Sequence, residues 1–291
     1  MKKNVLVTVL TTTYNRSNNL FDLYNSLNKQ SSYNFKWIVV DDGSTDDTTS
    51  SINKLINKTH KFEIEYFKLK NGGKHRALNY IFSKLDTDLT VIVDSDDQLV
   101  SDAIEKIEKN WNKYKNSEIC TMTFEHIYED GTPMVEIKKT VIEKRTIYPV
   151  KYKRLGDYAD VIITKYLKEY KFPTFENEKF LNEGDLLFYL SGQANSVFID
   201  DSLIVGGYQK DGLTKNIRNL QIKNYNGSLY TATLSMEKKY PMWFRLKNAV
   251  LYDYITIKSD VSTRQALKKS KYPILTTIAL LPALIYILLR K

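Results

Sequence analysis

Cysteine, histidine and proline are scarce in this chain of 291 residues, which has one, three and six of them. A single cysteine excludes an internal disulfide framework and suits a reducing cytoplasm. Cys120 lies in an apolar run, so we expect a small buried side chain there rather than a reactive thiol. The three histidines, His60, His75 and His126, do not have the spacing of a zinc motif.

The chain also lacks internal repeats and low-complexity linkers. A hydrophobic content of 42% with 26% charged residues is typical of a folded protein. The first residues run into a strand-like segment without the charged and apolar stretches of a signal peptide, so we do not expect secretion. The length suits one large domain, or one domain with a substantial appendage.

The net charge of +9 is concentrated near the C-terminal end of the sequence. The last 56 residues contain eleven Lys and Arg against three acids, which leaves the first 235 residues close to neutral. A nucleic-acid-binding protein more often spreads its basic residues over a folded face. Here they adjoin the most hydrophobic segment, which favours an anionic membrane surface as a partner and argues against nucleic acid.

That hydrophobic segment, residues 273–289, has no charged residue but is flanked by Lys268, Lys269, Lys271, Arg290 and Lys291. It is slightly short for a membrane-spanning helix, which needs about 20 apolar residues, and it contains Pro282. Apolar residues from Trp243 to Ile257 follow helical spacing just upstream. We therefore predict an interfacial amphipathic helix and a shallow anchor, at the cytoplasmic face of the membrane. Alternatively, both segments pack on the main domain or in an oligomer interface, and the oligomeric state is left open.

Strands and helices alternate over the first hundred residues, which predicts a parallel sheet covered by helices on both faces. The expected strands are 5–12, 37–40, 64–69 and 90–93, and the expected helices are 20–29, 45–57 and 74–85. Further along, we expect strands at 119–128 and 134–142, helices at 161–170 and 183–190, and mainly helix after 216. Ligands bind beyond the carboxyl ends of the strands in such a sheet.

A polar cluster follows each of the four expected strands, so all four clusters should lie along one edge of the sheet. The sharpest is Asp94-Ser95-Asp96, because two carboxylates at this spacing can converge on a Mg²⁺ or Mn²⁺ ion that also holds a diphosphate. Its alternative is an Asx-turn and cap for the next helix. Asp41 and Asp42 can accept from a ribose or base, although Ser44 or Thr45 could simply cap a helix. The Gly72-Gly73-Lys74 loop can approach a phosphate.

Together these clusters resemble the family 2 glycosyltransferases with the GT-A fold, in order and at the expected spacing over the first hundred residues. The segments that carry the resemblance are 11–16, 39–46, 71–79 and 93–97. The resemblance implies nucleotide or donor contacts for Thr13, Asp41, Asp42, Lys74, Asn79, Asp94 and Ser95. It implies a DxD pair in Asp94 and Asp96, with Asp96 the more direct metal ligand. It also implies inversion by a single displacement with one catalytic base.

The acceptor side is predicted from the segment 175–185, which is similar to that of capsule-type members. Glu183 fits the place of the base best and Asp185 is the alternative; both could instead serve only as an acidic first turn of a helix. Asp157 matches a recurring acceptor-side position. Lys210 lies in a segment that resembles a mobile loop closing on the diphosphate, although a solvated surface turn is the alternative.

The sequence therefore predicts an α/β protein of the GT-A, Rossmann-like nucleotide-diphospho-sugar transferase class with a membrane-associating helical extension. The expected division is a catalytic domain at 1–215, with nucleotide-sugar binding in 1–100 and the acceptor side in 101–215, followed by a helical, basic region at 216–291. The expected function is metal-dependent hexosyl transfer from a nucleotide-sugar, a UDP-sugar above all, to a lipid-linked saccharide acceptor in cell-surface polysaccharide synthesis. The rivals are a sugar-phosphate nucleotidyltransferase and a non-catalytic nucleotide-sugar-binding scaffold.

Overall fold

The computed structural model describes residues 5–58, 60–207, 216–259, 262, 266 and 270–289. The chain divides into two compact units. The first holds Met1–Lys171 and Tyr189–Gly207, and the second holds Phe172–Phe188 and Tyr208–Lys291. The second unit is therefore built from two separate stretches of chain. The functional division at residue 215 stays a prediction.

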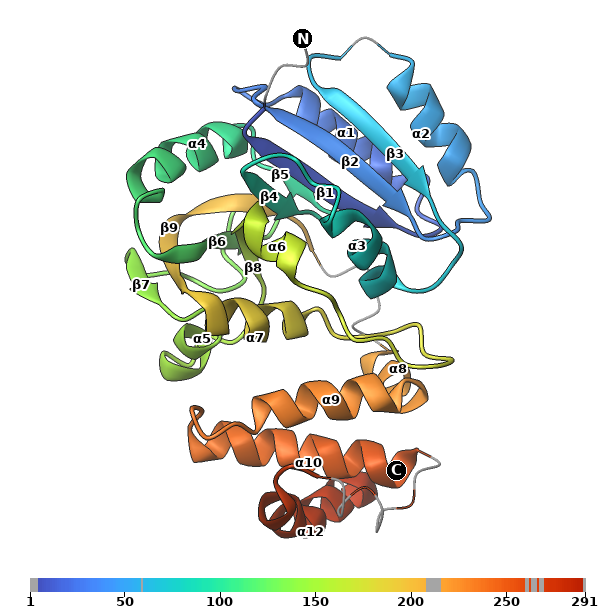
Figure 1. Cartoon of the computed structure of the whole chain (residues 1–291), viewed down its shortest axis with the longest axis vertical. Helices are drawn as coiled ribbons and strands as arrows, with labels where there is room; N and C mark the ends of the chain where they lie inside the picture. The colour runs from blue at the N-terminus through green and yellow to red at the C-terminus, as the bar shows by residue number, and fades with distance from the viewer. Residues whose placement is uncertain are drawn as a thin grey trace. The chain divides into compact units, whose positions relative to one another are not determined.

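Four parallel strands form one half of the sheet in the first unit, in the order β3-β2-β1-β4 (Figure 1). They are β1 (Val7–Thr13), β2 (Phe35–Asp41), β3 (Glu63–Lys68) and β4 (Leu89–Ile92). The helices that alternate with them are α1 (Asn19–Asn28), α2 (Thr48–Ile56) and α3 (Lys74–Phe82). Strands β1 and β2 are buried throughout, as expected for strands covered on both faces. The predicted parallel arrangement of the first four strands is confirmed.

The sheet continues beyond β4 in the order β8-β6-β9-β5, and β7 pairs with β9. This half is mixed, because β4–β8, β6–β8 and β5–β9 are antiparallel while β6–β9 is parallel. Its strands are β5 (Gln98–Leu99), β6 (Ile119–Ile127), β7 (Val141–Glu143), β8 (Tyr158–Ile163) and β9 (Asn195–Val205). Its helices are α4 (Ala103–Tyr114), α5 (Ile147–Lys151), α6 (Thr164–Glu169) and α7 (Gly184–Gln193).

Two of the expected elements differ in their bounds. The expected helix 161–170 is present as α6 but begins only at Thr164, because the β-branched residues 161–163 belong to β8, between β4 and β6. Of the expected strand 134–142, only the last two residues lie in a strand, β7, which pairs with β9, because β8 and β9 already occupy both edges of β6. The Glu125 side chain accepts the backbone N–H of Ile137 at 2.6 Å instead.

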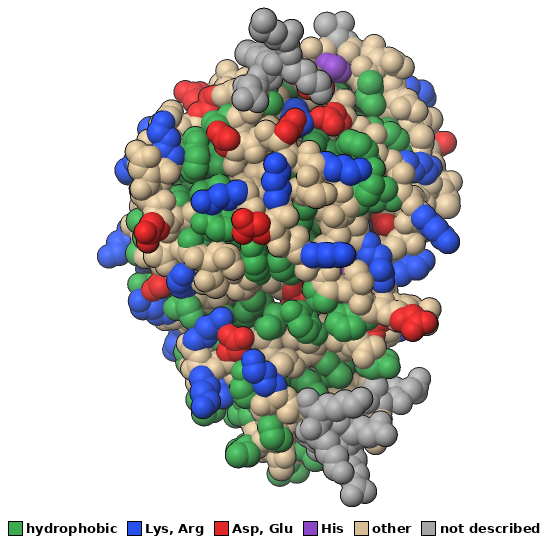
Figure 2. All heavy atoms as spheres, in the orientation of Figure 1, with side chains coloured by type: hydrophobic (Ala, Val, Ile, Leu, Met, Phe, Trp, Pro, Cys, Tyr) green, Lys and Arg blue, Asp and Glu red, His purple; other side chains and the backbone are tan. Residues whose placement is uncertain are grey.

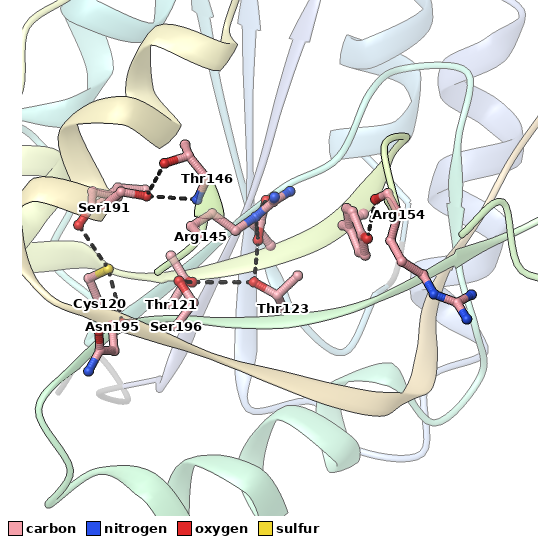
Figure 3. Close-up of polar contacts among 12 residues, drawn as sticks. Cys120, Thr121, Thr123, Arg145, Thr146, Arg154, Ser191, Asn195 and Ser196 are labelled. Carbon is pink, nitrogen blue, oxygen red and sulfur yellow. Dashed lines mark hydrogen bonds and ion pairs between the residues drawn. The ribbon is translucent and has the colours of Figure 1, made fainter. Parts of the chain in front are cut away.

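A polar network joins β6, β8 and β9 inside the first unit (Figure 3). The Arg145 side chain donates to both carboxylate oxygens of Asp160, at 2.8 and 3.0 Å, and Thr123 donates to the same carboxylate at 2.6 Å. Cys120 is buried beside this network, as expected, and donates to the carbonyl of Leu190 at 3.3 Å. Burial raises the pKa of the Cys120 thiol to about 11, so the thiol stays protonated and unreactive.

The second unit is helical after residue 216 in its described part, as the sequence predicts. Its helices are α8 (Ile217–Lys223), α9 (Tyr225–Ser235), α10 (Met242–Lys258) and α12 (Pro273–Leu289). The apolar residues Ala232, Ala249, Tyr252, Leu275 and Ala279 form a buried cluster that joins α9, α10 and α12. Among the described residues, no helix has the length and apolar character needed to cross a membrane.

Asp253 on α10 is a buried acid whose replacement should stabilise the protein. The residue is 1% exposed, and among the described residues neither carboxylate oxygen has a hydrogen-bond partner. Burial raises the pKa of Asp253 to about 7. Between its ordinary value and pH 7 the folded state therefore binds more protons than the unfolded state, so stability falls as pH rises through this range.

We expect Asp253→Asn to remove this fall. The change that it causes in the free energy of unfolding should be more favourable at pH 8 than at pH 4 by roughly 2–4 kcal/mol. Urea unfolding at pH 4, 6 and 8 measures the difference. Asp22→Asn, an exposed acid on α1, is the control and should leave the pH dependence unchanged. Parallel pH profiles for the wild type and Asp253→Asn would contradict a buried, protonated acid.

Candidate active site

The loops after β1 and β2 are joined by hydrogen bonds around Asn15. Asn15 has a positive φ of 53°, which Asn tolerates better than most residues. Its backbone N–H donates to the Ser44 hydroxyl at 2.9 Å, and its side-chain oxygen accepts the N–H of Thr45 at 2.8 Å. The first two polar clusters are thereby held together at the carboxyl edge of the parallel strands.

Asp42 holds the glycine loop against the end of β2. Its two carboxylate oxygens accept the backbone N–H groups of Gly72 and Gly73, each at 2.8 Å, and Asn71 donates to it at 3.1 Å. Gly43 allows this approach, since a Cβ there would lie 2.6 Å from the backbone nitrogen of Asn71. The predicted nucleotide contact at Asp42 thus also fixes the shape of the loop. This second role had no signal in the sequence.

We expect Asp42→Ala to loosen this loop even without a ligand. Each buried N–H left without an acceptor costs about 1–3 kcal/mol, so the melting temperature should fall clearly. Affinity for a nucleoside diphosphate should fall at least tenfold in calorimetry, because the loop is no longer pre-organised. Asp22→Ala should change neither value. An unchanged melting temperature would show that the loop does not depend on Asp42.

Asp41 and Thr13 lie deeper at the same strand ends. Asp41 is fully buried and accepts the Ser44 N–H and the Tyr66 hydroxyl, both at 2.7 Å. The pKa of Tyr66 is raised to about 12, chiefly by burial, with the adjacent Asp41 carboxylate contributing. Thr13 is 3% exposed, and no described residue makes a hydrogen bond to its hydroxyl. The structure therefore places both predicted donor-site residues at the expected edge.

The structure brings Lys74 together with the Asp94-Ser95-Asp96 segment. Lys74 is the first residue of α3, and its ammonium forms an ion pair with the Asp94 carboxylate at 2.5 Å. The Lys74 charge holds the pKa of Asp94 below its usual range. Ser95 is buried, and Asn79 lies half-buried on the same helix as Lys74. A cation and several carboxylates thus share the end of β4 with the glycine loop.

Negative charge accumulates around Asp97, next to the predicted DxD pair. The pKa of Asp97 is raised to about 8, first by burial and then by the charges of Asp94, Asp96 and Asp157. The His126 ring on β6 lies close by, with Nε2 3.7 Å from the Asp97 carboxylate. Asp157, predicted on the acceptor side, is therefore within electrostatic reach of the DxD segment. His126 was missed, because only the pairing of distant strands brings it here.

A hard divalent cation fits this charge distribution. Asp94, Asp96 and Asp97 lie within four residues of one another near the end of β4, and the charges of Asp94 and Asp96 add to burial in raising the pKa of Asp97. A bound cation would relieve that repulsion. In the described part of the chain, no three His, Cys, Asp or Glu side chains converge as a ready-made metal site. The fit is thus to an ion held by one or two carboxylates, with its other ligands supplied by a diphosphate.

Comparison with known proteins identifies the family. Residues 8–169, more than half of the chain, match the model described as glycosyl transferase family 2. The chain belongs to this family. The match covers β1 to α6, including all four polar clusters and Asp157.

The relatives agree with this assignment. The chain is 24% identical over 186 residues to the poly(ribitol-phosphate) beta-N-acetylglucosaminyltransferase TarS of Staphylococcus aureus, across 60% of this chain and 32% of TarS. The chain therefore spans about a third of the length of this curated relative.

Solved structures share the fold. The structure of S. aureus TarS 1–349 in complex with UDP-GlcNAc has a TM-score of 0.63 and 18% identity, over 94% of this chain and 79% of that one. The mannosyltransferase PcManGT of Pyrobaculum calidifontis, in complex with GDP-Man and Mn²⁺, has a TM-score of 0.58 and 15% identity, over 97% and 81%. The family match and these similarities confirm the predicted GT-A fold.

The two candidate bases lie at the start of α7, in the second unit. Asp185 is 2% exposed, and burial raises its pKa to about 7. Thr231 is close enough to lower this pKa slightly, but its hydroxyl donates to the carbonyl of Gly227 at 3.1 Å. A cavity of about 160 Å³ in the same unit is lined by Gly184 and Thr231, among others. Glu183 is half-buried. Lys210 lies outside the described residues.

The acidic segment before α7 also has a structural role that the sequence did not reveal. The Glu178 carboxylate accepts the backbone N–H groups of Asn226 and Gly227, at 2.8 and 2.9 Å. Because these are the second and third residues of α9, Glu178 satisfies N–H groups that have no partner within the helix. The segment 172–188 is thereby tied to the helices of its own unit.

Proposed function

We propose that this chain is an inverting glycosyltransferase that moves a hexose from a UDP-sugar to a lipid-linked saccharide during cell-surface polysaccharide synthesis. The observation that carries the proposal is the meeting of Lys74 and Asp94 beside the glycine loop that Asp42 holds. This edge offers the N-terminal end of α3, an ammonium and several carboxylates, which is the chemistry that a nucleoside diphosphate with a divalent cation requires.

Residues of the first unit would bind the leaving diphosphate and balance its charge. Asp96 and Asp94 would hold Mn²⁺ or Mg²⁺, which when bound neutralises the charge that develops on the diphosphate. Lys74 supplies a positive charge at the start of α3, where helix N–H groups also favour an anion. Thr13 and Asp41 are suited to the nucleoside, because they lie at the ends of the adjacent strands β1 and β2. The donor complexes named above, one with UDP-GlcNAc and one with GDP-Man and Mn²⁺, support this reading.

One carboxylate near the start of α7 accepts the proton of the attacking hydroxyl. The hydroxyl oxygen forms a bond to the anomeric carbon as the bond to the diphosphate breaks, so the configuration inverts. Sequence similarity favours Glu183. The raised pKa of Asp185 supports Asp185 instead, because a base whose pKa lies near the working pH is both available and strong enough to take a proton.

The proposed acceptor is a saccharide carried on a lipid. TarS, by its name, acts on poly(ribitol phosphate), which is a precedent for a large acceptor. The basic, apolar end of this chain suits an acceptor that carries a lipid.

A donor screen tests the proposal. We expect UDP-sugars with Mn²⁺ to raise the melting temperature more than GDP-mannose, and radiolabel in the sugar to move to an acceptor saccharide with release of UDP. Release of pyrophosphate from a nucleoside triphosphate would instead indicate nucleotidyl transfer. Donor binding without any turnover, tested with extracted lipid-linked saccharides, would indicate a binding scaffold.

A further inference from the structure

The exposed surface of α12 is almost entirely apolar. Its exposed large side chains are Ile274, Ile278, Leu281, Leu284, Ile285, Leu288 and Leu289, with Ile274 at 78% and Leu281 at 66% exposure. Most of them recur every three or four residues and therefore form one stripe along the helix. Single exposed apolar residues are ordinary, but a continuous stripe of this length is a mark of an interaction surface.

The opposite face of α12 is occupied within its own unit. Leu275, Ala279 and Ala283 are buried, and the first two pack in the cluster with α10. The rings of Tyr254 on α10 and Tyr286 on α12 lie 5.4 Å apart. Because one face rests along α10, only the other face is available to a partner. A helix that is apolar all round is normally covered by protein or by lipid.

Residues with interfacial chemistry lie at one end of this helix pair. Arg245, in the first turns of α10, lies 5.9 Å from the ring of Tyr272, which directly precedes α12. At this end Lys271 is exposed, as are Met242 and Trp243, at 60% and 43%. Tryptophan and lysine beside an apolar surface are typical of the boundary between water and lipid headgroups. Figure 2 shows apolar side chains at the surface where Figure 1 places α12.

We propose that the exposed stripe of α12 inserts into one leaflet of an anionic lipid bilayer, with the helix lying along the membrane surface. The charge balance favours lipid over a second copy of the chain. The last 56 residues carry eleven basic residues against three acids, so two copies would repel, whereas anionic headgroups attract them. No acidic side chain within α12 could pair with the basic residues of a second copy. The anionic cytoplasmic leaflet has the matching chemistry.

A single label on the full-length chain tests the insertion directly. Cys120 is buried with a raised pKa, so a maleimide dye should react only with an introduced cysteine. On vesicles of phosphatidylglycerol and phosphatidylcholine, NBD at Leu281→Cys should brighten at least twofold and shift to the blue. NBD at Ile142→Cys, an exposed site on β7, should do neither. No change at Leu281→Cys would overturn the proposal.

Matched substitutions separate the stripe from general hydrophobicity. Ile278→Gln with Leu281→Gln should lower the vesicle partition coefficient at least tenfold in co-sedimentation. Ile142→Gln with Leu155→Gln removes the same two side-chain types from exposed sites elsewhere and should leave it unchanged. Lys271→Gln should weaken binding only when anionic lipid is present. Light scattering tests the alternative of a second copy. If the wild type is a dimer that does not bind vesicles, and Ile278→Gln with Leu281→Gln makes it monomeric, the stripe is a dimer interface instead. These assays contain no donor or acceptor, so their outcome is independent of the proposed reaction.

Discussion

Asp96→Ala should abolish sugar transfer while the chain remains folded. Asp96 lies close to Asp94 after β4. The ion pair between Asp94 and Lys74 indicates that a positive charge is favourable at this place. A metal that stabilises a leaving diphosphate contributes several kcal/mol, so its loss should slow turnover by at least about 10²-fold. The measurement is UDP release with and without an acceptor, over a range of Mn²⁺ concentrations.

Two controls make this result specific to the metal. Asp22→Ala removes an exposed acid from α1 and should keep full activity. Excess EDTA should inactivate the wild type, and Mn²⁺ should restore it. Full activity of the wild type in EDTA would remove the metal from the mechanism, and an active Asp96→Ala enzyme would remove this residue from the metal site.

Asp185→Asn should bind the donor normally and lose transfer by roughly 10²–10⁴-fold, the range expected for a general base. Because the pKa of Asp185 is raised to about 7, its carboxylate becomes available only as pH rises through 7. The wild-type kcat/KM should therefore increase with pH across this region, and the residual activity of Asp185→Asn should lack that rise. Donor affinity from calorimetry and transfer rates between pH 5.5 and 8.5 provide both readouts.

Glu183→Gln is the matched comparison, two residues away on the same turn. We expect it to retain the pH-dependent rise and most of its activity. If Glu183→Gln is inactive and Asp185→Asn is active, the similarity-based prediction of Glu183 is the correct one. The buried Asp185 would then affect only stability, and its replacement should raise the melting temperature at pH 8.

The donor edge could be predicted from sequence because its geometry follows from a local rule. Parallel strands bring their carboxyl ends to one edge, so residues as distant as Lys74 and Asp94 could be expected to meet. No such rule predicts which strands form the second half of the sheet or how they pair. Strand β8 has a helix-like apolar pattern, and β9 contains Asp200 and Asp201, so neither was predicted. The position of His126 depends on the pairing of β6 with these strands.

The hydrogen bonds that individual acidic side chains accept could not be predicted from the sequence either. Asp42 was predicted as a nucleotide contact and Glu178 lies in the predicted acceptor-side segment, yet each accepts backbone N–H groups within the protein. Burial of Asp185 and Asp253 was equally hidden, because the hydrophobic period of a helix does not reveal an isolated buried acid. A buried acid of this kind can be recognised only from the three-dimensional structure, which shows the neighbours that exclude water from its carboxylate.

Strand β9 also decides when the first unit can fold during synthesis on the ribosome. It pairs with β5, β6 and β7, although it follows them by between about 50 and 100 residues in the chain. Until residue 205 has been translated, β5 and β7 lack their partner and one edge of β6 is open. Open strand edges promote aggregation, so a fragment truncated near residue 169 should be insoluble even though it contains every predicted donor residue except Lys210.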